Sequence, residues 1–463
     1  MRGTLTVQGA KKPVTAITGT LAVALLLAGT RWGSYIGYAP LFLTDVLIAL
    51  AVIHAALGHA TRGTKALSAG RRRHPPLMFI AFFAYLVLRA LLSVEYAFTM
   101  DWVRDFVPFA YGVLAFISAA SFAVASKEDQ ARTMKWIWGA LIFHLLWTAG
   151  IVLSGVNTEA FPRMPASEVP VFSARPDTDM AILGITAALM LRRVLLKQNR
   201  FWATIGMLLA IVTATGMHSR AGLLSMALSL TTAYVITYAA VPKSDRNRRT
   251  LMTLAVPVLL SVAAAGVAQT NPGQRLIASV FQTSTGAEYE LNAQGTERAR
   301  EMAWEGVTDW TLSDPSRFFF GGGFGNDFLS ESGVLDYLQG TEYVNVRSPH
   351  NWLVGVLART GIVGVGLAVL ILGALVVQVG RTRARLGQDE LPAAAALIVL
   401  GIIPVALLGV VLESPFGAVP FWWAAGILFA LRAEEVESAG CPKNDTARKE
   451  SSPQLYRVRQ AQF

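Results

Sequence analysis

The sequence contains a single cysteine, Cys441, in a chain of 463 residues. A lone cysteine excludes an intramolecular disulfide and a cysteine metal cluster, and we expect no metal site. Charged residues are also scarce, at 15%, whereas hydrophobic residues make up 53%. Together with a mean hydropathy of +0.46, this composition excludes an ordinary soluble domain and predicts an all-α, polytopic integral membrane protein.

Apolar stretches of about 16 to 25 residues recur along the chain, each long enough to cross about 30 Å of hydrocarbon as a helix. The first follows Lys11 and Lys12 and lacks a small-x-small cleavage site, which predicts an uncleaved anchor. We expect one transmembrane domain over 1–432 and a polar, disordered tail over 433–463. Twelve spans are predicted, near 13–30, 41–58, 77–93, 106–125, 136–155, 177–191, 201–217, 221–241, 251–269, 351–379, 391–412 and 417–432.

Lysine is missing from one set of loops. All nine lysines fall on the side of the N-terminus, together with the basic loops 59–76, 126–135, 191–200, 241–250 and 380–390. Because cytoplasmic loops carry the excess of Lys and Arg, this pattern predicts that both termini are cytoplasmic. It also explains the formal charge of +10, since the basic residues are not clustered on a face that would bind nucleic acid.

Most of the remaining polar residues lie in one large extracytoplasmic loop, 270–349, which has eleven acidic residues, five arginines and no lysine. An arginine keeps its charge and can hold a carboxylate or a phosphate with two parallel hydrogen bonds. Each arginine on this side therefore either pairs with an acidic residue or binds an anionic ligand.

Two of these arginines stand in distinctive surroundings. Arg220 lies in a tight turn between two apolar stretches, where it could bind a lipid-linked phosphate or extend to phospholipid head groups. Arg300 and Trp304 are four residues apart and would share one helical face. Trp304 could pack against the guanidinium or against a sugar, whereas Glu297 could simply neutralise Arg300.

His350 and Asn351 close the large loop where a long apolar stretch begins. Asn351 could orient the imidazole, and an unperturbed histidine has a pKa suited to taking a proton from a hydroxyl. A purely structural, interfacial histidine is the alternative. The carboxylates of Asp177, Asp179 and Glu413, at the ends of other predicted spans, could act as bases or cap helices.

The glycine-rich segment Gly321–Gly325 lacks the Lys-Ser/Thr pair of a nucleotide-binding loop, so we expect no nucleotide there. Its glycines permit positive φ and close approach of the backbone. The segment could fold the loop back over the membrane face, or it could serve only as a hinge.

Taken together, the order, spacing and predicted sidedness of these motifs resemble the O-antigen ligase and O-antigen polymerase superfamily of bacterial polysaccharide enzymes. The motifs that carry the resemblance are Ser219-Arg220, Arg300 four residues before Trp304, Phe320-Gly-Gly-Gly-Phe-Gly325-Asn, Pro349-His350-Asn351-Trp-Leu, Thr360-Gly361 and Gly364.

The resemblance implies a GT-C-like fold of about twelve transmembrane helices in the bacterial cytoplasmic (inner) membrane, with an extracytoplasmic active site. It implies an inverting glycosyltransferase, without metal, nucleotide or other cofactor, that moves a glycan from an undecaprenyl-diphosphate carrier to a hydroxyl of a glycan or glycolipid acceptor. It assigns the carrier diphosphate to Arg220 and Arg300, and the acceptor hydroxyl to His350. Asn351 and Trp304 would support the site, and Arg175 is a possible further ligand in a segment that departs from the family's pattern.

The resemblance does not separate a ligase from a polymerase, since both use the same donor. A polysaccharide or lipid transporter, or a flippase, is the rival class for a twelve-span chain. Transporters are expected to show matched repeats, broken midplane helices and paired buried ions. The sequence has no clear repeat, and Arg89 looks like a lone cation within a span.

Overall fold

The computed structural model describes residues 15–431 apart from 39–40, 71–76, 98, 166, 243, 248, 251, 255–265, 267, 270–273, 275–287 and 339–346. The predicted tail 433–463, with Cys441, lies outside the described residues. The regular elements are helices and one short antiparallel hairpin, β1 (Gly37–Tyr38) with β2 (Leu41–Phe42).

Helices lie on eleven of the twelve predicted ranges. In the ninth range, 251–269, the structure describes only residues 252–254, 266, 268 and 269. The range 106–125 is covered by two helices that follow each other closely, α4 and α5. The helices are α1 (Thr15–Gly33), α2 (Leu43–Gly70), α3 (Leu77–Leu92), α4 (Met100–Ala110), α5 (Val113–Val124), α6 (Lys127–Ser154), α7 (Pro176–Leu195), α8 (Arg200–Thr215), α9 (Arg220–Ala240), α15 (Trp352–Gln388), α16 (Glu390–Leu407) and α17 (Pro415–Ala430).

Among the described residues, five helical segments are long and apolar enough to cross a membrane: Met100–Val124, Lys127–Ser154, Arg220–Ala240, Trp352–Gln388 and Glu390–Leu407. Shorter apolar helices accompany them at Leu43–Leu57, Leu77–Leu92, Arg200–Thr215 and Pro415–Ala430. The protein is therefore a polytopic membrane protein built from helices.

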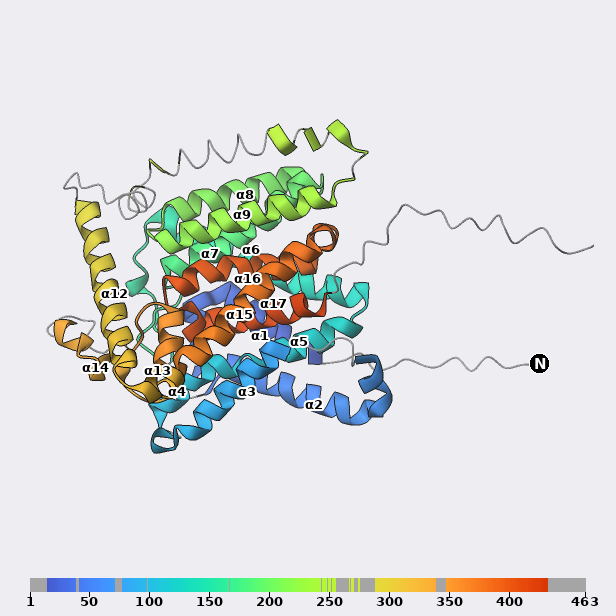
Figure 1. Ribbon diagram of the computed structural model, residues 1–463. Coiled ribbons are helices and arrows are strands. Elements are labelled where there is room, and N and C mark those ends of the chain that lie inside the picture. Colours follow the sequence, from blue (N-terminus) through green and yellow to red (C-terminus); the bar gives the residue numbers. More distant parts are fainter. Residues whose placement is uncertain are drawn as a thin grey trace, which may run out of the picture. The chain divides into compact units, whose positions relative to one another are not determined.

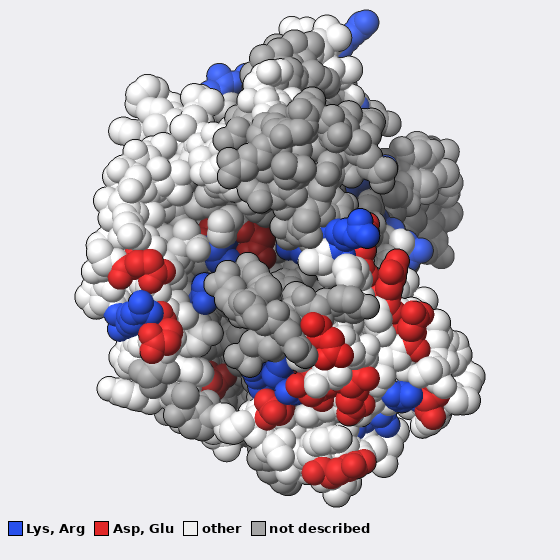
Figure 2. Space-filling model, turned by 90° about the vertical axis from the view of Figure 1, so that its left-hand side faces the viewer, with Lys and Arg blue, Asp and Glu red and all other residues white. Residues whose placement is uncertain are grey.

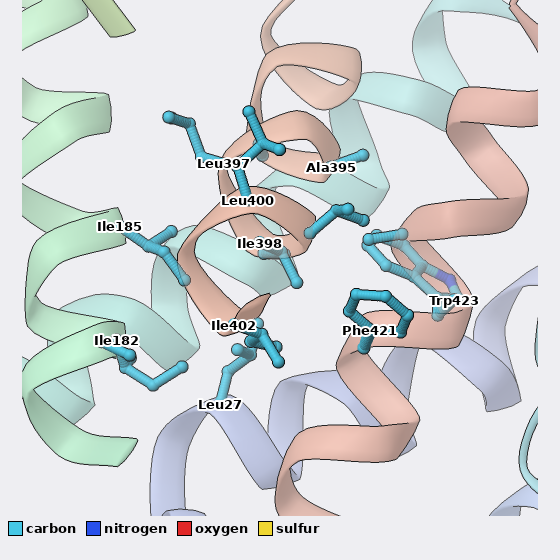
Figure 3. Packing of buried hydrophobic residues seen from close by; sticks show 14 of the residues in the cluster. Leu27, Ile182, Ile185, Ala395, Leu397, Ile398, Leu400, Ile402, Phe421 and Trp423 are labelled. Atoms are coloured by element: carbon cyan, nitrogen blue, oxygen red, sulfur yellow. The ribbon is translucent and has the colours of Figure 1, made fainter. Parts of the chain in front are cut away.

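The core is centred on α16, which is apolar on all sides and is buried along most of its length. Figure 3 shows α16 between α7 and α17, with Leu27 of α1 below it. Ile182 and Ile185 of α7 face Ile398 and its neighbours, and Phe421 and Trp423 of α17 approach from the other side. This packing fixes the relative positions of α7 and α17, and both of these helices begin near the candidate site described below.

The directions of three helices decide which residues meet. A Cβ added to Gly222 at the start of α9 would lie 2.5 Å from Cβ of Met180 near the start of α7, and Gly184 faces Met226 one turn further along both helices. Hence α7 and α9 run parallel. Near its C-terminal end α15 packs through Gly387 against the C-terminal end of α9, so α15 begins at the same end as well.

The opposite ends of these helices are joined by ion pairs. Lys127 Nζ lies 2.6 Å from Asp389 Oδ1, and Arg193 Nε lies 2.8 Å from Glu390 Oε1. These contacts join the loops 126–135, 191–200 and 380–390, which the distribution of basic residues assigns to one side. Which side of the membrane they occupy stays a prediction.

The described part of the large loop is folded. It contains α12 (Glu288–Leu312), α13 (Pro315–Phe320), α14 (Phe328–Glu331) and the short helix η3 (Val334–Leu338). Figure 1 shows α12 running across the ends of the long helices. A small apolar cluster, which includes Val307, Trp310, Phe328, Leu329 and Val334, also takes in Ala358 of α15. The loop is therefore packed onto the start of α15.

Candidate active site

The backbone of His350 is in an unusual conformation, with a φ of 55°. A residue with a Cβ adopts this left-handed region at a cost of about 1 kcal/mol, and such residues concentrate at functional sites. The strain lies directly before α15. Asn351 is the N-cap of this helix, and its Oδ1 accepts hydrogen bonds from the backbone amides of Leu353 (3.0 Å) and Val354 (3.3 Å).

This capping bond corrects one expectation from the sequence. The side-chain oxygen of Asn351 serves the first turn of α15 and supports His350 through the backbone, because a capped helix start holds the preceding residue in place. It does not reach the imidazole.

Trp304 of α12 holds the same segment from the other side. Its Nε1 donates a hydrogen bond to the carbonyl oxygen of Pro349, at 2.6 Å. The helical face predicted for Arg300 and Trp304 is present, since both lie on α12. The indole thereby anchors the peptide bond that precedes His350, a role that the sequence did not indicate, and its packing against a sugar stays a prediction.

The surroundings of His350 shift its acid–base behaviour. Burial, and next the positive charges of Arg300 and Arg175, lower the pKa of His350 from 6.5 to about 4, while Asp177 acts in the opposite direction. The imidazole is therefore neutral near pH 7, with a lone pair available. The same shift shows that Arg300, Arg175 and Asp177 all lie within electrostatic reach of His350.

Arg175 and Asp177 occupy the first turn of α7. The backbone amide of Arg175, the N-cap residue, donates to Asp179 Oδ2 at 2.6 Å. The Arg175 side chain lies over the ring of Phe416, with its guanidinium carbon 5.0 Å from the ring centroid, and its Nε donates to Asp177 Oδ1 at 3.1 Å. The prediction that these carboxylates could cap a helix is confirmed for Asp179. Arg175 acts electrostatically on His350, and its role as a ligand stays a prediction.

Arg220 is the first residue of α9, directly after the N-cap Ser219, whose hydroxyl accepts a hydrogen bond from the amide of Gly222 at 3.1 Å. The Arg220 side chain is half-buried. Because α9 and α7 run parallel and touch at Gly222 and Met180, Arg220 lies at the same end of the helix pair as Arg175. The tight turn predicted around Arg220 is confirmed.

Among the described helices, α7, α9, α15 and α17 begin at this end, and the start of α17 is marked by Phe416 beneath Arg175. Each helix N-terminus carries a partial positive charge and free backbone amides, which favour an anion. Figure 2 shows that charged side chains of both signs gather on this face of the molecule. Arg175 and Arg300, which act electrostatically on His350, and Arg220 at the same end of the helices supply positive charge that can hold a polyanionic group beside a neutral imidazole.

A buried charge network that we did not predict from the sequence supports the site. Asp105 of α4 binds Arg359 of α15 (Oδ1 to Nη2, 3.3 Å), and Arg347 lies 3.5 Å from its other oxygen. Arg359 also lies 3.6 Å from Glu413. One carboxylate thereby holds two arginines that flank His350 in the sequence. The signal that could have revealed this network is Asp105 itself, an aspartate at the end of a predicted span, because a buried carboxylate needs a positively charged partner.

Glu413, a possible base on sequence grounds, belongs to this network. Burial raises its pKa, and the positive charge of Arg359 opposes this shift. Its structural role in pairing Arg359 therefore accounts for its position between α16 and α17.

The glycine-rich segment folds back onto α15, in agreement with the prediction that it folds the large loop back. Gly321, Gly323 and Gly325 have φ values of 70°, 88° and 90°. The amides of Gly322 and Gly323 donate to the carbonyls of Ala358 (2.7 Å) and Arg359 (3.1 Å). These carbonyls lie just before a break in α15 at Gly361, where φ is 66° and ψ is −170°, so the loop satisfies groups that the break leaves free.

Arg89, expected as a lone cation within a span, lies in the last turn of α3 and makes no ion pair with a described residue. Its Nη2 donates to the carbonyl of Gly321 at 3.0 Å, which ties α3 to the glycine-rich segment.

Among the described residues, no group of three or more His, Cys, Asp or Glu side chains is arranged to hold a metal ion.

Comparison with known proteins adds a family. Residues 205–369 match the family model described as O-antigen ligase. The match contains Arg220, Arg300, Trp304 and His350, and it ends before Glu413 and begins after Arg175. No curated protein matches the chain.

Proposed function

Because residues 205–369 form a domain of the O-antigen ligase family, whose members act in surface polysaccharide biosynthesis, we propose that this protein is an inverting membrane glycosyltransferase. It transfers a glycan from an undecaprenyl-diphosphate carrier to a sugar hydroxyl of a glycan or glycolipid acceptor on the extracytoplasmic face. The observation that carries the proposal is His350, held at positive φ and within electrostatic reach of Arg300 and Arg175.

The chemistry needs few groups. The acceptor oxygen attacks the anomeric carbon, the bond to the diphosphate breaks, and the electron pair leaves with the diphosphate while the hydroxyl proton passes to His350. Arg220, Arg300 and Arg175 hold the diphosphate and neutralise the charge that it gains. Positioning and electrostatic stabilisation are sufficient for such a displacement, since the donor already carries a good leaving group.

The electrostatic surroundings of His350 suit a base that takes the hydroxyl proton after the donor has bound. Burial, and next the charges of Arg300 and Arg175, lower the pKa of His350 to about 4, so the imidazole is neutral. A bound diphosphate offsets their charge and moves the pKa of His350 back toward neutrality, which makes it a stronger base. His350 therefore gains basicity when the donor is present.

We further propose the membrane arrangement that this function requires: about twelve spans in a GT-C-like fold over 1–432, both termini cytoplasmic, and 433–463 as a cytoplasmic tail. Two observations support it. Helices lie on eleven of the twelve predicted ranges, and basic loops assigned to one side contact each other at the end opposite to His350.

The central test replaces His350 with Ala in the host and measures lipid-linked glycan and mature polymer, with insertion of the variant confirmed. We expect mature polymer to disappear and the lipid-linked donor to accumulate. His54→Ala, a change at a histidine of α2, serves as the matched control. Normal polymer in the His350→Ala strain refutes the proposal.

The same experiment separates the two reactions. A ligase defect leaves complete chains on the carrier, because only their transfer to the final acceptor fails. A polymerase defect leaves single repeat units instead of a ladder of lengths.

A transporter or flippase stays the second candidate, because the structure has two features expected of that class: a helix broken at Gly361 and the buried pair Asp105–Arg359. Purified protein in proteoliposomes distinguishes the two. A transferase forms a new covalent glycan product from the host's own extracted lipid-linked glycan, whereas a transporter only moves it between leaflets.

A further inference from the structure

Asp177 presents one anchored and one open carboxylate oxygen. Its Oδ1 accepts hydrogen bonds from Arg175 Nε (3.1 Å) and from Thr178, through the backbone amide (2.8 Å) and the hydroxyl (3.2 Å). Its Oδ2 makes no hydrogen bond to any described residue. One neighbour of Oδ2 is Gly409, where an added Cβ would lie 3.2 Å away, so any side chain at 409 would crowd this oxygen.

The turn that carries Asp177 is firmly held. Asp179 is completely buried, and its Oδ2 binds the amide of Arg175. Its Oδ1 lies 4.0 Å from Nε2 of His144 on α6, which is also completely buried. The other ring nitrogen of His144 lies 3.3 Å from the carbonyl of Ala28 on α1. The first turn of α7 is thereby tied to two other helices, and Asp177 is presented by a rigid element.

Asp177 is also close to the proposed chemistry. It is the acidic group that acts electrostatically on His350, opposite in sign to Arg300 and Arg175. About a quarter of its side chain is exposed, 23%. An accessible carboxylate oxygen beside the proposed base has the chemistry to accept a hydrogen bond from a sugar hydroxyl.

We propose that Asp177 binds a hydroxyl of the acceptor sugar through Oδ2 and positions that sugar beside His350. The proposal rests on the proposed function and adds an acceptor-binding residue to it. Adjacent positions on one turn then hold the two substrates: Arg175 holds the donor diphosphate and Asp177 holds the acceptor. Asp177 takes no proton in this scheme, because the proton of the attacking hydroxyl goes to His350.

The alternative role for Asp177 is to orient Arg175 and nothing more. The two roles differ in which substrate is affected. Loss of an orienting partner weakens donor binding through Arg175, whereas loss of an acceptor ligand raises the KM for acceptor and leaves binding of the carrier unchanged.

The test uses the full-length protein in proteoliposomes with the host's extracted lipid-linked glycan as donor and a glycolipid extract of the host membrane as acceptor. For Asp177→Asn we expect the KM for the acceptor extract to rise about tenfold, as for the loss of a hydrogen bond to a charged group. Binding of undecaprenyl diphosphate, measured alone, stays unchanged. Slow hydrolysis of the donor by water persists, so the ratio of hydrolysis to transfer rises.

Two further variants make the result decisive. If Asp177 binds the acceptor, the double variant Asp177→Asn/Arg175→Gln has a higher KM for the acceptor than Arg175→Gln alone. If Asp177 only orients Arg175, the double variant has the same acceptor KM as Arg175→Gln. Glu168→Gln removes a carboxylate that is 93% exposed from the loop preceding α7 and is expected to leave both KM values unchanged.

An unchanged acceptor KM in Asp177→Asn, or no additional defect in the double variant, overturns the proposal. If Asp177→Asn does not insert into the membrane, Asp177→Glu replaces it, because this variant keeps the charge and moves it by one methylene. We expect Asp177→Glu to raise the acceptor KM as well, and an unchanged KM in this variant also overturns the proposal. The proposed function fails separately, when His350→Ala retains transfer.

Discussion

Asp105 and Arg359 lie 254 positions apart in the sequence, and their side chains meet at 3.3 Å with less than 5% of either exposed. The contact joins α4 to the N-terminal segment of α15, between the capped start at Asn351 and the break at Gly361. Asp105 also approaches Arg347 on the other side of His350. The position of His350 therefore depends on a residue from the first quarter of the chain.

Replacing Asp105 with Asn should destabilise the protein, since Arg359 would keep its charge in a buried place with weaker compensation. Loss of one partner of a buried ion pair costs about 3 kcal/mol or more. Thermal unfolding of the purified protein in detergent measures the effect. Glu168→Gln breaks an exposed ion pair and should cost below about 1 kcal/mol; equal losses in the two variants would contradict the buried network.

Gly361→Ala should destabilise the protein strongly. The φ of 66° is unfavourable for a side chain, and an added Cβ meets the backbone of Phe319 and Phe320. We expect a loss of about 2 kcal/mol or more in the same unfolding measurement. Gly366→Ala is the matched control on α15, because nothing lies within 4 Å of a Cβ there; a smaller loss at 361 than at 366 speaks against the break.

Trp304→Phe removes the hydrogen bond to the Pro349 carbonyl and keeps most of the ring. Because the strained His350 backbone loses an anchor, we expect kcat for transfer to fall about tenfold, with a smaller effect on the KM for donor. Trp202→Phe, at a tryptophan that is 71% exposed, should leave kcat unchanged. A normal kcat in Trp304→Phe shows that the anchor is dispensable.

The pH dependence of kcat/KM should reflect the ionisation of His350 in the free enzyme. The base must be unprotonated, and its pKa is lowered to about 4, so this group should keep kcat/KM level down to about pH 5 and reduce it as pH falls through about 4. Arg300→Gln removes one of the charges that lower the pKa of His350, so the acid limb should move to higher pH. An acid limb that stays in place when Arg300 is neutralised contradicts the assignment of that limb to His350.

The helices could largely be predicted, because their apolar stretches are local signals that depend on the transfer of each segment out of water. The tight turn before Arg220 could be predicted on the same basis. The hydrogen bond of Arg89 to the carbonyl of Gly321 could not be predicted, because it forms only when the fold brings a distant loop beside α3. The capping role of Asn351 could not be predicted either, because its side-chain oxygen meets the amides of Leu353 and Val354 only once α15 has formed.

The sequence by itself determined that this chain is a helical membrane protein, and it singled out Arg220, Arg300 and His350, because hydropathy and unusual charges are visible residue by residue. The tertiary structure decided which of the other polar groups join them. Parallel packing of α7 on α9 brings Arg175 and Asp177 to the end where Arg220 lies, and the contact of Asp105 with Arg359 holds the segment that carries His350. Such pairings depend on helix direction and packing between distant segments, which no local pattern encodes.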